Sequence, residues 1–310
     1  MTDLSIVVPA YNEQENISVL HHRLTEALRG KSYEILFVDD GSTDKTLEVC
    51  EKLHCEDKHV KVIQFRRNFG QTAAFDAGFK RAQGKVIITI DADLQNDPHD
   101  IDLLLKKLDE GYDCVSGWRI NRKDSIGKTI TSLFANGFRK LLTGEKIHDS
   151  GCSLKAYRKE CVENVDLYGE THRFIPTILS WKGFKVGEVK VKHYPRAFGK
   201  TKYGFSRVFR GLFDFIVIKF WMNYSTKPMY FLGPVGLVLT FFGSLIGGYL
   251  TFDKIFFGAS LANRPLLLLA ILLVILGVQF LIFGIILDIL VKIYYENRTK
   301  TYYSIKKVLQ

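Results

Sequence analysis

The sequence has few cysteines, and none of them stands in a paired metal-binding motif. Five occur in 310 residues, without a Cys-x-x-Cys spacing. Cys50, His54 and Cys55 lie close together, but a structural zinc site needs a second pair of ligands, which the sequence does not show. We therefore expect free thiols in a reducing compartment rather than a zinc centre.

Charge is absent from two long stretches. Met229–Leu250 and Pro265–Leu287 contain no Asp, Glu, Lys or Arg. Each is long enough to cross a hydrocarbon core of about 30 Å as a helix. Two buried core helices are the alternative, but uninterrupted apolar runs of this length are rare in soluble domains. The sequence predicts transmembrane helices over about residues 229–251 and 265–290.

The N-terminus "MTDLSIVVPAYNE" lacks the basic region that begins a signal peptide. The net charge is +10, and basic side chains flank the two apolar runs, whereas the loop between them carries only Lys254 and Arg264. The positive-inside rule then places the catalytic part and both termini in the cytoplasm, as a multi-pass protein of the cell membrane. The basic excess indicates contact with anionic lipid rather than with nucleic acid.

Strand-like and helix-like segments alternate over the first 120 residues, which predicts an α/β fold: a mostly parallel sheet with helices on both faces. We expect three parts, namely a catalytic domain (1–205), an amphipathic interfacial helix (206–226), and a membrane domain with a cytoplasmic tail (227–310). Further helices are predicted from about Glu13 to Leu28 and from Ser125 to Leu142. Ser42 or Thr43 is expected to cap the helix after the second strand, and Asp97 the helix after the fourth.

Acidic or amide side chains follow three of the expected strands, in "PAYNE", "VDDGS" and "DADLQ". Because such loops meet at one edge of a parallel sheet, Asp40, Asp91 and Asp93 are expected to lie close together. Crowded carboxylates repel unless a cation neutralises them, and oxygen ligands favour Mg²⁺ or Mn²⁺. Gln95 adds a neutral oxygen ligand. A solvated acidic turn is the alternative, which a second acidic loop at a neighbouring strand end makes weaker.

These three motifs, in this order, resemble the nucleotide-sugar-dependent glycosyltransferases of family 2, which have the GT-A fold. The segments "SGWR", "DSGCSLKAYRK", "HRFIP" and "RAFGKTKYG", followed by membrane helices, resemble the polyprenyl-phosphate glycosyltransferases, the group of dolichyl-phosphate mannose synthase. Two membrane helices after an amphipathic one are typical of its bacterial-type branch. The resemblance covers nearly the whole chain.

The resemblance implies roles for individual residues. Asp91, Asp93 and Gln95 would hold the divalent metal, with Asp93, Asp149 and Arg119 in catalysis. Asp149 is a candidate base or acceptor-orienting group. The nucleotide-sugar pocket would be lined by Pro9, Tyr11, Glu13, Val38, Asp40, Asp91 and Ala92. The acceptor phosphate would be bound by Arg119, Arg196 and Lys202, with Arg122 and Lys128 as further candidates.

The implied reaction is an inverting transfer of one hexose from a nucleotide sugar to a polyprenyl phosphate on the cytoplasmic leaflet. UDP-glucose or UDP-N-acetylglucosamine is the expected donor, with GDP-mannose as the alternative. A processive polysaccharide synthase is disfavoured because its Q-x-x-R-W motif is missing, and no Arg-Trp pair occurs. An inactive membrane scaffold is disfavoured by the intact "DAD" pair, and a lipid flippase by having two spans.

A Gly-x-x-x-Gly spacing, Gly243 to Gly247, lies in the first apolar run. Such a spacing lets helices approach closely, although glycine is also simply tolerated in membrane helices. We predict a homo-oligomer held through the membrane helices, with a tetramer as in similar enzymes.

Overall fold

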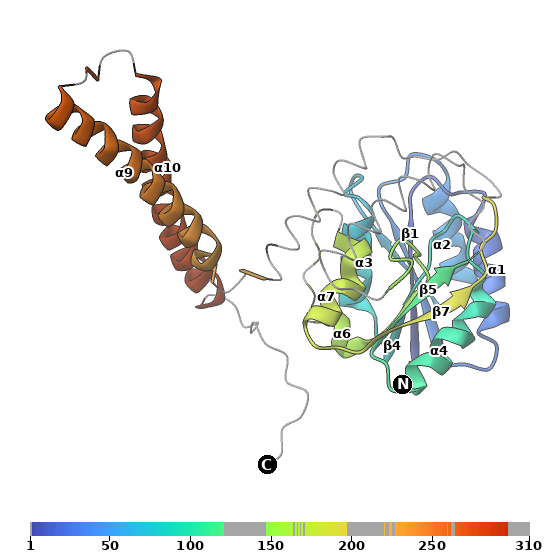
Figure 1. The fold of residues 1–310 in the computed structure, drawn as a ribbon. Coiled ribbons are helices and arrows are strands. Elements are labelled where there is room, and N and C mark those ends of the chain that lie inside the picture. The colour runs from blue at the N-terminus through green and yellow to red at the C-terminus, as the bar shows by residue number, and fades with distance from the viewer. Residues whose placement is uncertain are drawn as a thin grey trace. The chain divides into compact units, whose positions relative to one another are not determined.

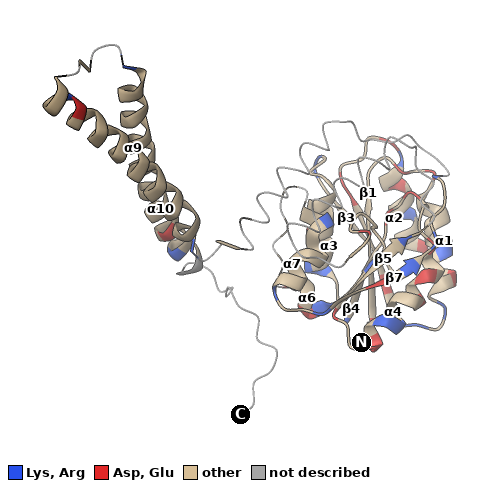
Figure 2. Ribbon diagram, viewed as in Figure 1, with Lys and Arg blue, Asp and Glu red and all other residues tan. Residues whose placement is uncertain are grey.

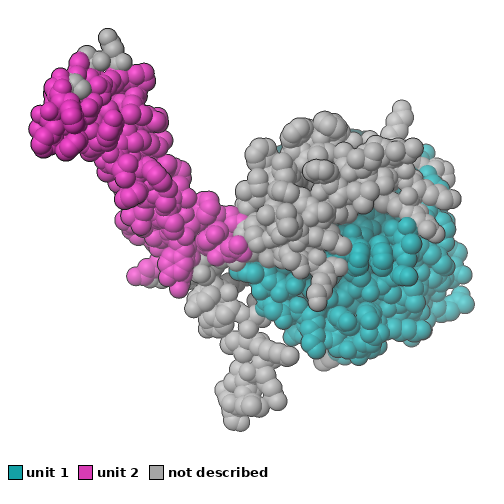
Figure 3. All heavy atoms as spheres, in the orientation of Figure 1, with its two compact units in different colours: residues 1–217 teal, residues 218–310 magenta. Residues whose placement is uncertain are grey.

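The computed structural model describes residues 2–120, 147–163, 165, 167, 169, 171–196, 220, 223–224, 227–258, 260–261 and 264–296. The chain divides into two compact units, residues 1–217 and 218–310 (Figure 3). The helix predicted over Ser125–Leu142 lies outside the described residues, and so does almost all of the predicted amphipathic helix.

A seven-stranded sheet in the order β3-β2-β1-β4-β6-β5-β7 forms the first unit (Figure 1). Its strands are β1 (Leu4–Ala10), β2 (Tyr33–Asp39), β3 (Val60–Gln64), β4 (Val86–Thr89), β5 (Cys114–Arg119), β6 (Lys155–Arg158) and β7 (Val186–Val191). All neighbouring pairs are parallel except the two that β6 makes with β4 and β5. The prediction of a mostly parallel α/β sheet is therefore confirmed.

Helices cover both faces of this sheet. Side chains alternate along each strand, so that Ile6 and Val8 of β1 pack on one face and Val7 on the other. The first face carries α1 (Ile17–Ala27), α2 (Thr46–Glu56) and α4 (Ile101–Asp109), preceded by the 3₁₀ turn η1 (Pro98–Asp100). The second carries α3 (Gln71–Arg81), α6 (Lys159–Glu163) and α7 (Ile175–Trp181), which follows the 3₁₀ turn η2 (Thr171–Phe174).

Two local predictions were wrong. Helix α1 begins at Ile17 rather than near Glu13, because residues 13–16 form a turn in which Asn16 N–H donates to the Glu13 carbonyl at 2.9 Å. Helix α2 is not capped by Ser42 or Thr43. Instead Asp44 Oδ1 accepts the Thr46 N–H at 2.9 Å, and Ser42 Oγ accepts the N–H of Asn12. The predicted cap at Asp97 is confirmed, since its side chain accepts from His99 N–H.

The second unit contains a hairpin of two long apolar helices, α9 (Met229–Phe257) and α10 (Pro265–Glu296). Both are long and apolar enough to cross a membrane, and their charged residues lie toward the helix ends (Figure 2). Glycine brings the helices into close contact, because a Cβ atom at Gly236 would lie 2.7 Å from the Gly277 carbonyl oxygen. The Arg264–Asp253 ion pair, at 2.7 Å, ties the helices together beside their connecting loop.

Candidate active site

The predicted convergence of acidic strand ends is present in the fold. Strand β1 lies between β2 and β4, and all three are parallel, so their carboxyl ends share one edge. Glu13 follows β1, Asp40 follows β2, and Asp91 and Asp93 follow β4. This edge is the one at which open α/β sheets bind ligands.

Asp40 anchors the loop between β3 and α3. Its two carboxylate oxygens accept the backbone N–H groups of Phe69 and Gly70, at 2.7 and 2.9 Å. Burial raises the pKa of Asp40, and these two N–H donors oppose the rise. Gly41 has a φ of +69° and a Cβ atom there would lie 2.7 Å from both Arg67 Cα and Asn68 N, so the two loops pack backbone to backbone. Asp40 therefore shapes the loop, and its predicted contact with a nucleobase stays a prediction.

Asp91 and Asp93 lie at the centre of the edge. The Gln71 side chain donates from Nε2 to Asp91 Oδ1 at 2.7 Å. Burial, followed by the charge of Asp93, raises the pKa of Asp91 to about 6, against the opposing effects of Ser153, Arg119 and Lys155. Asp93 is 8% exposed, and burial raises its pKa as well. A half-buried and a buried carboxylate, one residue apart, concentrate negative charge at this position.

The oxygen chemistry of this position fits a hard divalent cation. Mg²⁺ is usually bound through one or two carboxylates, and substrate phosphates complete its coordination. Asp91 and Asp93 supply carboxylates, and the half-buried Gln95 supplies an amide, whose Nε2 donates to the Tyr194 carbonyl at 3.3 Å. Among the described residues, no group of three or more His, Cys, Asp or Glu side chains could hold a metal by itself. Asp91, Asp93 and Gln95 therefore suit a metal shared with a diphosphate.

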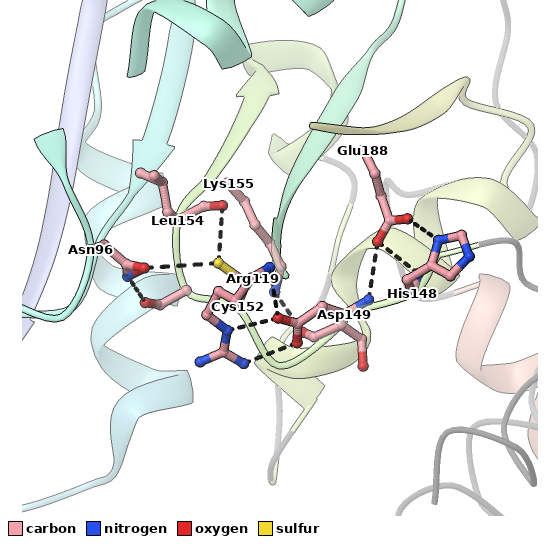
Figure 4. A network of polar contacts seen from close by, with 10 residues as sticks. Asn96, Arg119, His148, Asp149, Cys152, Leu154, Lys155 and Glu188 are labelled. Atoms are coloured by element: carbon pink, nitrogen blue, oxygen red, sulfur yellow. Dashed lines mark hydrogen bonds and ion pairs between the residues drawn. The ribbon is translucent and has the colours of Figure 1, made fainter. Parts of the chain in front are cut away.

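Arg119 forms a two-pronged ion pair with Asp149. Nε and Nη2 of Arg119 donate to the two carboxylate oxygens at 2.7 and 2.9 Å (Figure 4). Burial alone would lower the pKa of Arg119, but the hydrogen bonds and charge of Asp149 raise it above its ordinary value. Because both oxygens of Asp149 accept from Arg119, the geometry favours orienting Arg119 over acting as a base.

Two further side chains hold the loop that carries Asp149. Glu188 of β7 accepts the N–H groups of His148 and Asp149 on Oε1, at 2.7 and 3.1 Å (Figure 4). Lys155 of β6 is 4% exposed and donates from Nζ to the Ser150 carbonyl at 3.0 Å. Burial lowers the pKa of Lys155, although nearby acidic groups including Asp149 and Asp91 counteract that effect.

The structure describes some of the remaining predicted site residues but not others. Pro9 and Val38 face each other as partners in the β1–β2 register, and Tyr11 is half-buried just beyond β1. The side chains of Val38 and Ala92 are almost fully buried, at 0% and 3% exposure, which leaves them little surface for a ligand. Arg122, Lys128 and Lys202 lie outside the described residues. The assignment of these residues to nucleotide and phosphate stays a prediction.

Lys155 and Glu188 were not expected to take part. The segment Arg66–Gln71 was expected to close the nucleotide pocket, but no role was assigned to Gln71, which opens the helix after the third strand. Lys155 stands in a short buried strand, where an isolated lysine is unusual. Glu188 gives no such signal, since an exposed edge strand commonly carries charges.

A sequence model described as glycosyl transferase family 2 matches residues 5–166. The chain belongs to glycosyl transferase family 2. It is therefore a glycosyltransferase, and the matched region contains all three acidic strand ends together with Arg119 and Asp149.

Two kinds of relative match this glycosyltransferase over almost its whole length. Dodecaprenyl-phosphate galacturonate synthase of Rhizobium johnstonii is 39% identical, with 99% of this chain and 93% of the relative covered. Undecaprenyl-phosphate 4-deoxy-4-formamido-L-arabinose transferase of Pectobacterium atrosepticum is 35% identical, with 99% and 94% covered. The resemblance to polyprenyl-phosphate glycosyltransferases is thereby confirmed.

Solved structures share the fold of this glycosyltransferase at low sequence identity. Glucosyl-3-phosphoglycerate synthase from Mycobacterium tuberculosis, in complex with Mn²⁺, UDP and glucosyl-3-phosphoglycerate, superposes with a TM-score of 0.57. The two are 18% identical, and 73% of this chain and 82% of that one are covered. A further mycobacterial protein gives a TM-score of 0.54 at 16% identity, with 73% and 77% covered. The GT-A-like fold is confirmed.

Proposed function

We propose that this glycosyltransferase moves one sugar from a nucleoside diphosphate sugar to a polyprenyl phosphate at the cytoplasmic face of the cell membrane. The observation that carries the proposal is the match with two polyprenyl-phosphate enzymes, which extends over 99% of the chain and so includes the apolar hairpin. The site supports it, because carboxylates suited to a metal–diphosphate lie beside arginines suited to phosphates.

The acceptor phosphate is already anionic near neutral pH. One of its oxygens attacks C1 of the sugar, forming the new O–C1 bond as the bond from C1 to the diphosphate oxygen breaks on the opposite side. The configuration at C1 is therefore inverted. This step needs no general base, which agrees with both oxygens of Asp149 accepting hydrogen bonds from Arg119.

Bound Mg²⁺ or Mn²⁺ would neutralise charge on the leaving diphosphate. Asp91 and Asp93 would hold it, with Gln95 as a neutral ligand. Arg119 would bind phosphate oxygens with Asp149 fixing its orientation, and Arg196 would bind the acceptor phosphate.

The sugar is the open part of the proposal. A hexose from UDP-glucose or UDP-N-acetylglucosamine was predicted, whereas the two relatives are named for galacturonate and 4-deoxy-4-formamido-L-arabinose. We propose that the donor carries glucose, N-acetylglucosamine, galacturonate or 4-deoxy-4-formamido-L-arabinose, with GDP-mannose as the alternative donor. The catalytic part would be residues 1–205 and the membrane part 227–310, with the Phe257–Pro265 connection outside the cell.

The test is transfer by membranes that contain the protein. Membranes are incubated with each radiolabelled nucleotide sugar, and the lipid phase is extracted and analysed for a sugar linked through one phosphate. One donor is expected to label the lipid in a Mg²⁺-dependent way, and membranes with Asp93→Asn serve as the negative control. Absence of lipid labelling with every donor, from protein shown to be folded, would contradict the proposal.

A further inference from the structure

Arg196 connects two acidic strand ends. Its Nη2 lies 2.8 Å from Asp93 Oδ2, and its Nη1 lies 3.7 Å from Glu13 Oε1. The side chains of Asp93 and Glu13 are 11% and 10% exposed, and that of Arg196 is 24% exposed. The cation therefore covers two carboxylates that are largely removed from solvent.

This guanidinium is the main counter-charge of Asp93. Burial raises the pKa of Asp93, and the charge of Arg196 is the largest effect that lowers it. The carboxylate has two oxygens: Oδ2 faces Arg196, and Oδ1 accepts the Gln95 N–H at 3.2 Å. A guanidinium does not lose its proton in proteins, so Arg196 can leave Oδ2 only by moving.

We propose that Arg196 and the divalent metal compete for Asp93 Oδ2. Arrival of the metal with the donor diphosphate displaces the guanidinium from the carboxylates. The released guanidinium then pairs with the next anion at the site, the phosphate of the acceptor, whose oxygens match its fork. The last step rests on the proposed function, whereas the competition for Asp93 does not.

The exchange couples the two substrates. While Arg196 is held by Asp93 and Glu13 it is less available to the acceptor, so donor binding promotes acceptor binding. By linkage the reverse also holds, and a phosphate that draws Arg196 away must strengthen metal binding by the same factor. The arrangement favours loading of the donor before the acceptor.

The first test measures the affinity of the full-length protein for Mn²⁺ alone, by electron paramagnetic resonance of free Mn²⁺. Arg196→Met should bind Mn²⁺ at least about tenfold more tightly than wild type, because a competing cation within a few ångströms is removed. Lys185→Met is the matched control, since it removes one positive charge at the far end of β7. It should leave the affinity within about twofold of wild type. Equal or weaker Mn²⁺ binding by a folded Arg196→Met protein would overturn the proposal.

The second test follows Mn²⁺ binding by the wild type as a phosphate is added, with Arg196→Met as the comparison. A short-chain prenyl phosphate in detergent should tighten Mn²⁺ binding by the wild type but not by Arg196→Met, which also corrects for Mn²⁺ bound by the phosphate itself. Inorganic phosphate in a parallel titration shows whether the anion suffices without the lipid chain. Unchanged or weaker Mn²⁺ binding with both phosphates would overturn the coupling. Failure of lipid labelling, with tighter Mn²⁺ binding by Arg196→Met, would refute the proposed function and leave the competition intact.

Discussion

Arg119 and Asp149 are 30 residues apart in the chain, yet the guanidinium of one meets both carboxylate oxygens of the other at 2.7 and 2.9 Å. The pair joins the end of β5 to the loop before β6, and Glu188 and Lys155 hold that loop from either side. The arginine that we propose to bind phosphate is thereby held in one orientation, and such preorganisation lowers the barrier to a reaction.

Asp149→Asn should lower the transfer rate roughly 100-fold, because an amide offers one acceptor and no charge to orient Arg119. We expect the pH–rate profile to keep its shape, because the proposed role of Asp149 is to orient Arg119 rather than to act as a base. Steady-state kinetics of lipid labelling from pH 6 to 9 measures both effects. Asp109→Asn, an exposed substitution on α4, is the control. Loss of an acidic-limb ionisation in the variant would instead support a base role for Asp149.

Metal removal should abolish transfer. EDTA is expected to stop lipid labelling, and Mg²⁺ or Mn²⁺ should restore it, because without a cation Asp91 and Asp93 repel the leaving diphosphate. Asp93→Asn should lower the rate on the order of 10²–10³-fold. Asp102→Asn on α4, whose carboxylate is largely in solvent, should retain full activity. Undiminished transfer in EDTA would refute the metal role of Asp91 and Asp93.

Binding of metal and donor should weaken in acid. The pKa of Asp91 is about 6, above the ordinary value of about 3.9, so between these pH values the folded chain carries a proton there that an unfolded chain lacks. A metal ligand must be ionised, and affinity for Mn²⁺ with nucleotide sugar should therefore fall below pH 6, by up to about tenfold per unit. Calorimetry from pH 5 to 8 measures it.

The substitution Lys155→Met tests the ionisation of Asp91 in a second way, because it should raise the pKa of that carboxyl. The charge of Lys155 lowers the pKa of Asp91, so its removal should move the decline in metal affinity to higher pH. Asp91→Asn should bind Mn²⁺ weakly at every pH. An affinity that is independent of pH down to 5 in the wild type would contradict the assignment to Asp91.

The two glycines of the Gly-x-x-x-Gly motif should respond differently to substitution. A Cβ atom at Gly243 would lie 2.8 Å from Val274 Cγ2 and 2.9 Å from the Ala270 carbonyl of α10, whereas nothing lies within 4 Å of one at Gly247. Gly243 therefore serves the hairpin within one chain, and only Gly247 has space for another copy. Only the substitution Gly247→Leu therefore tests whether this motif packs copies of the chain together in the predicted homo-oligomer.

Gly243→Leu should lower the thermal stability of the protein in detergent, and Gly247→Leu should not. Native mass spectrometry in mild detergent shows whether Gly247→Leu changes the oligomeric state. If Gly247→Leu leaves an oligomer intact, contact between copies does not use this glycine. A wild type that is monomeric and fully active in nanodiscs would contradict the oligomer itself.

The sequence by itself determined the local chemistry and the architecture. The acidic pairs directly after β-branched runs placed Asp91 and Asp93 at a strand end, since strand polarity follows from the alternation of strands and helices. The length of the uncharged runs determined α9 and α10 in the same way. These features depend on neighbours in the chain, so the order of residues is sufficient to predict them.

Only the tertiary structure decided which distant side chains meet. Strand β6 enters the sheet antiparallel between β4 and β5. Its four residues carry no periodic pattern, yet this placement pairs Lys155 with Thr89, two residues before Asp91. Arg196 reaches Asp93 across 103 residues of chain. Such contacts follow from how the sheet buries both of its faces. The periodicity of hydrophobic residues and the local motifs specify which residues are buried, but they do not specify the partner of a buried charge.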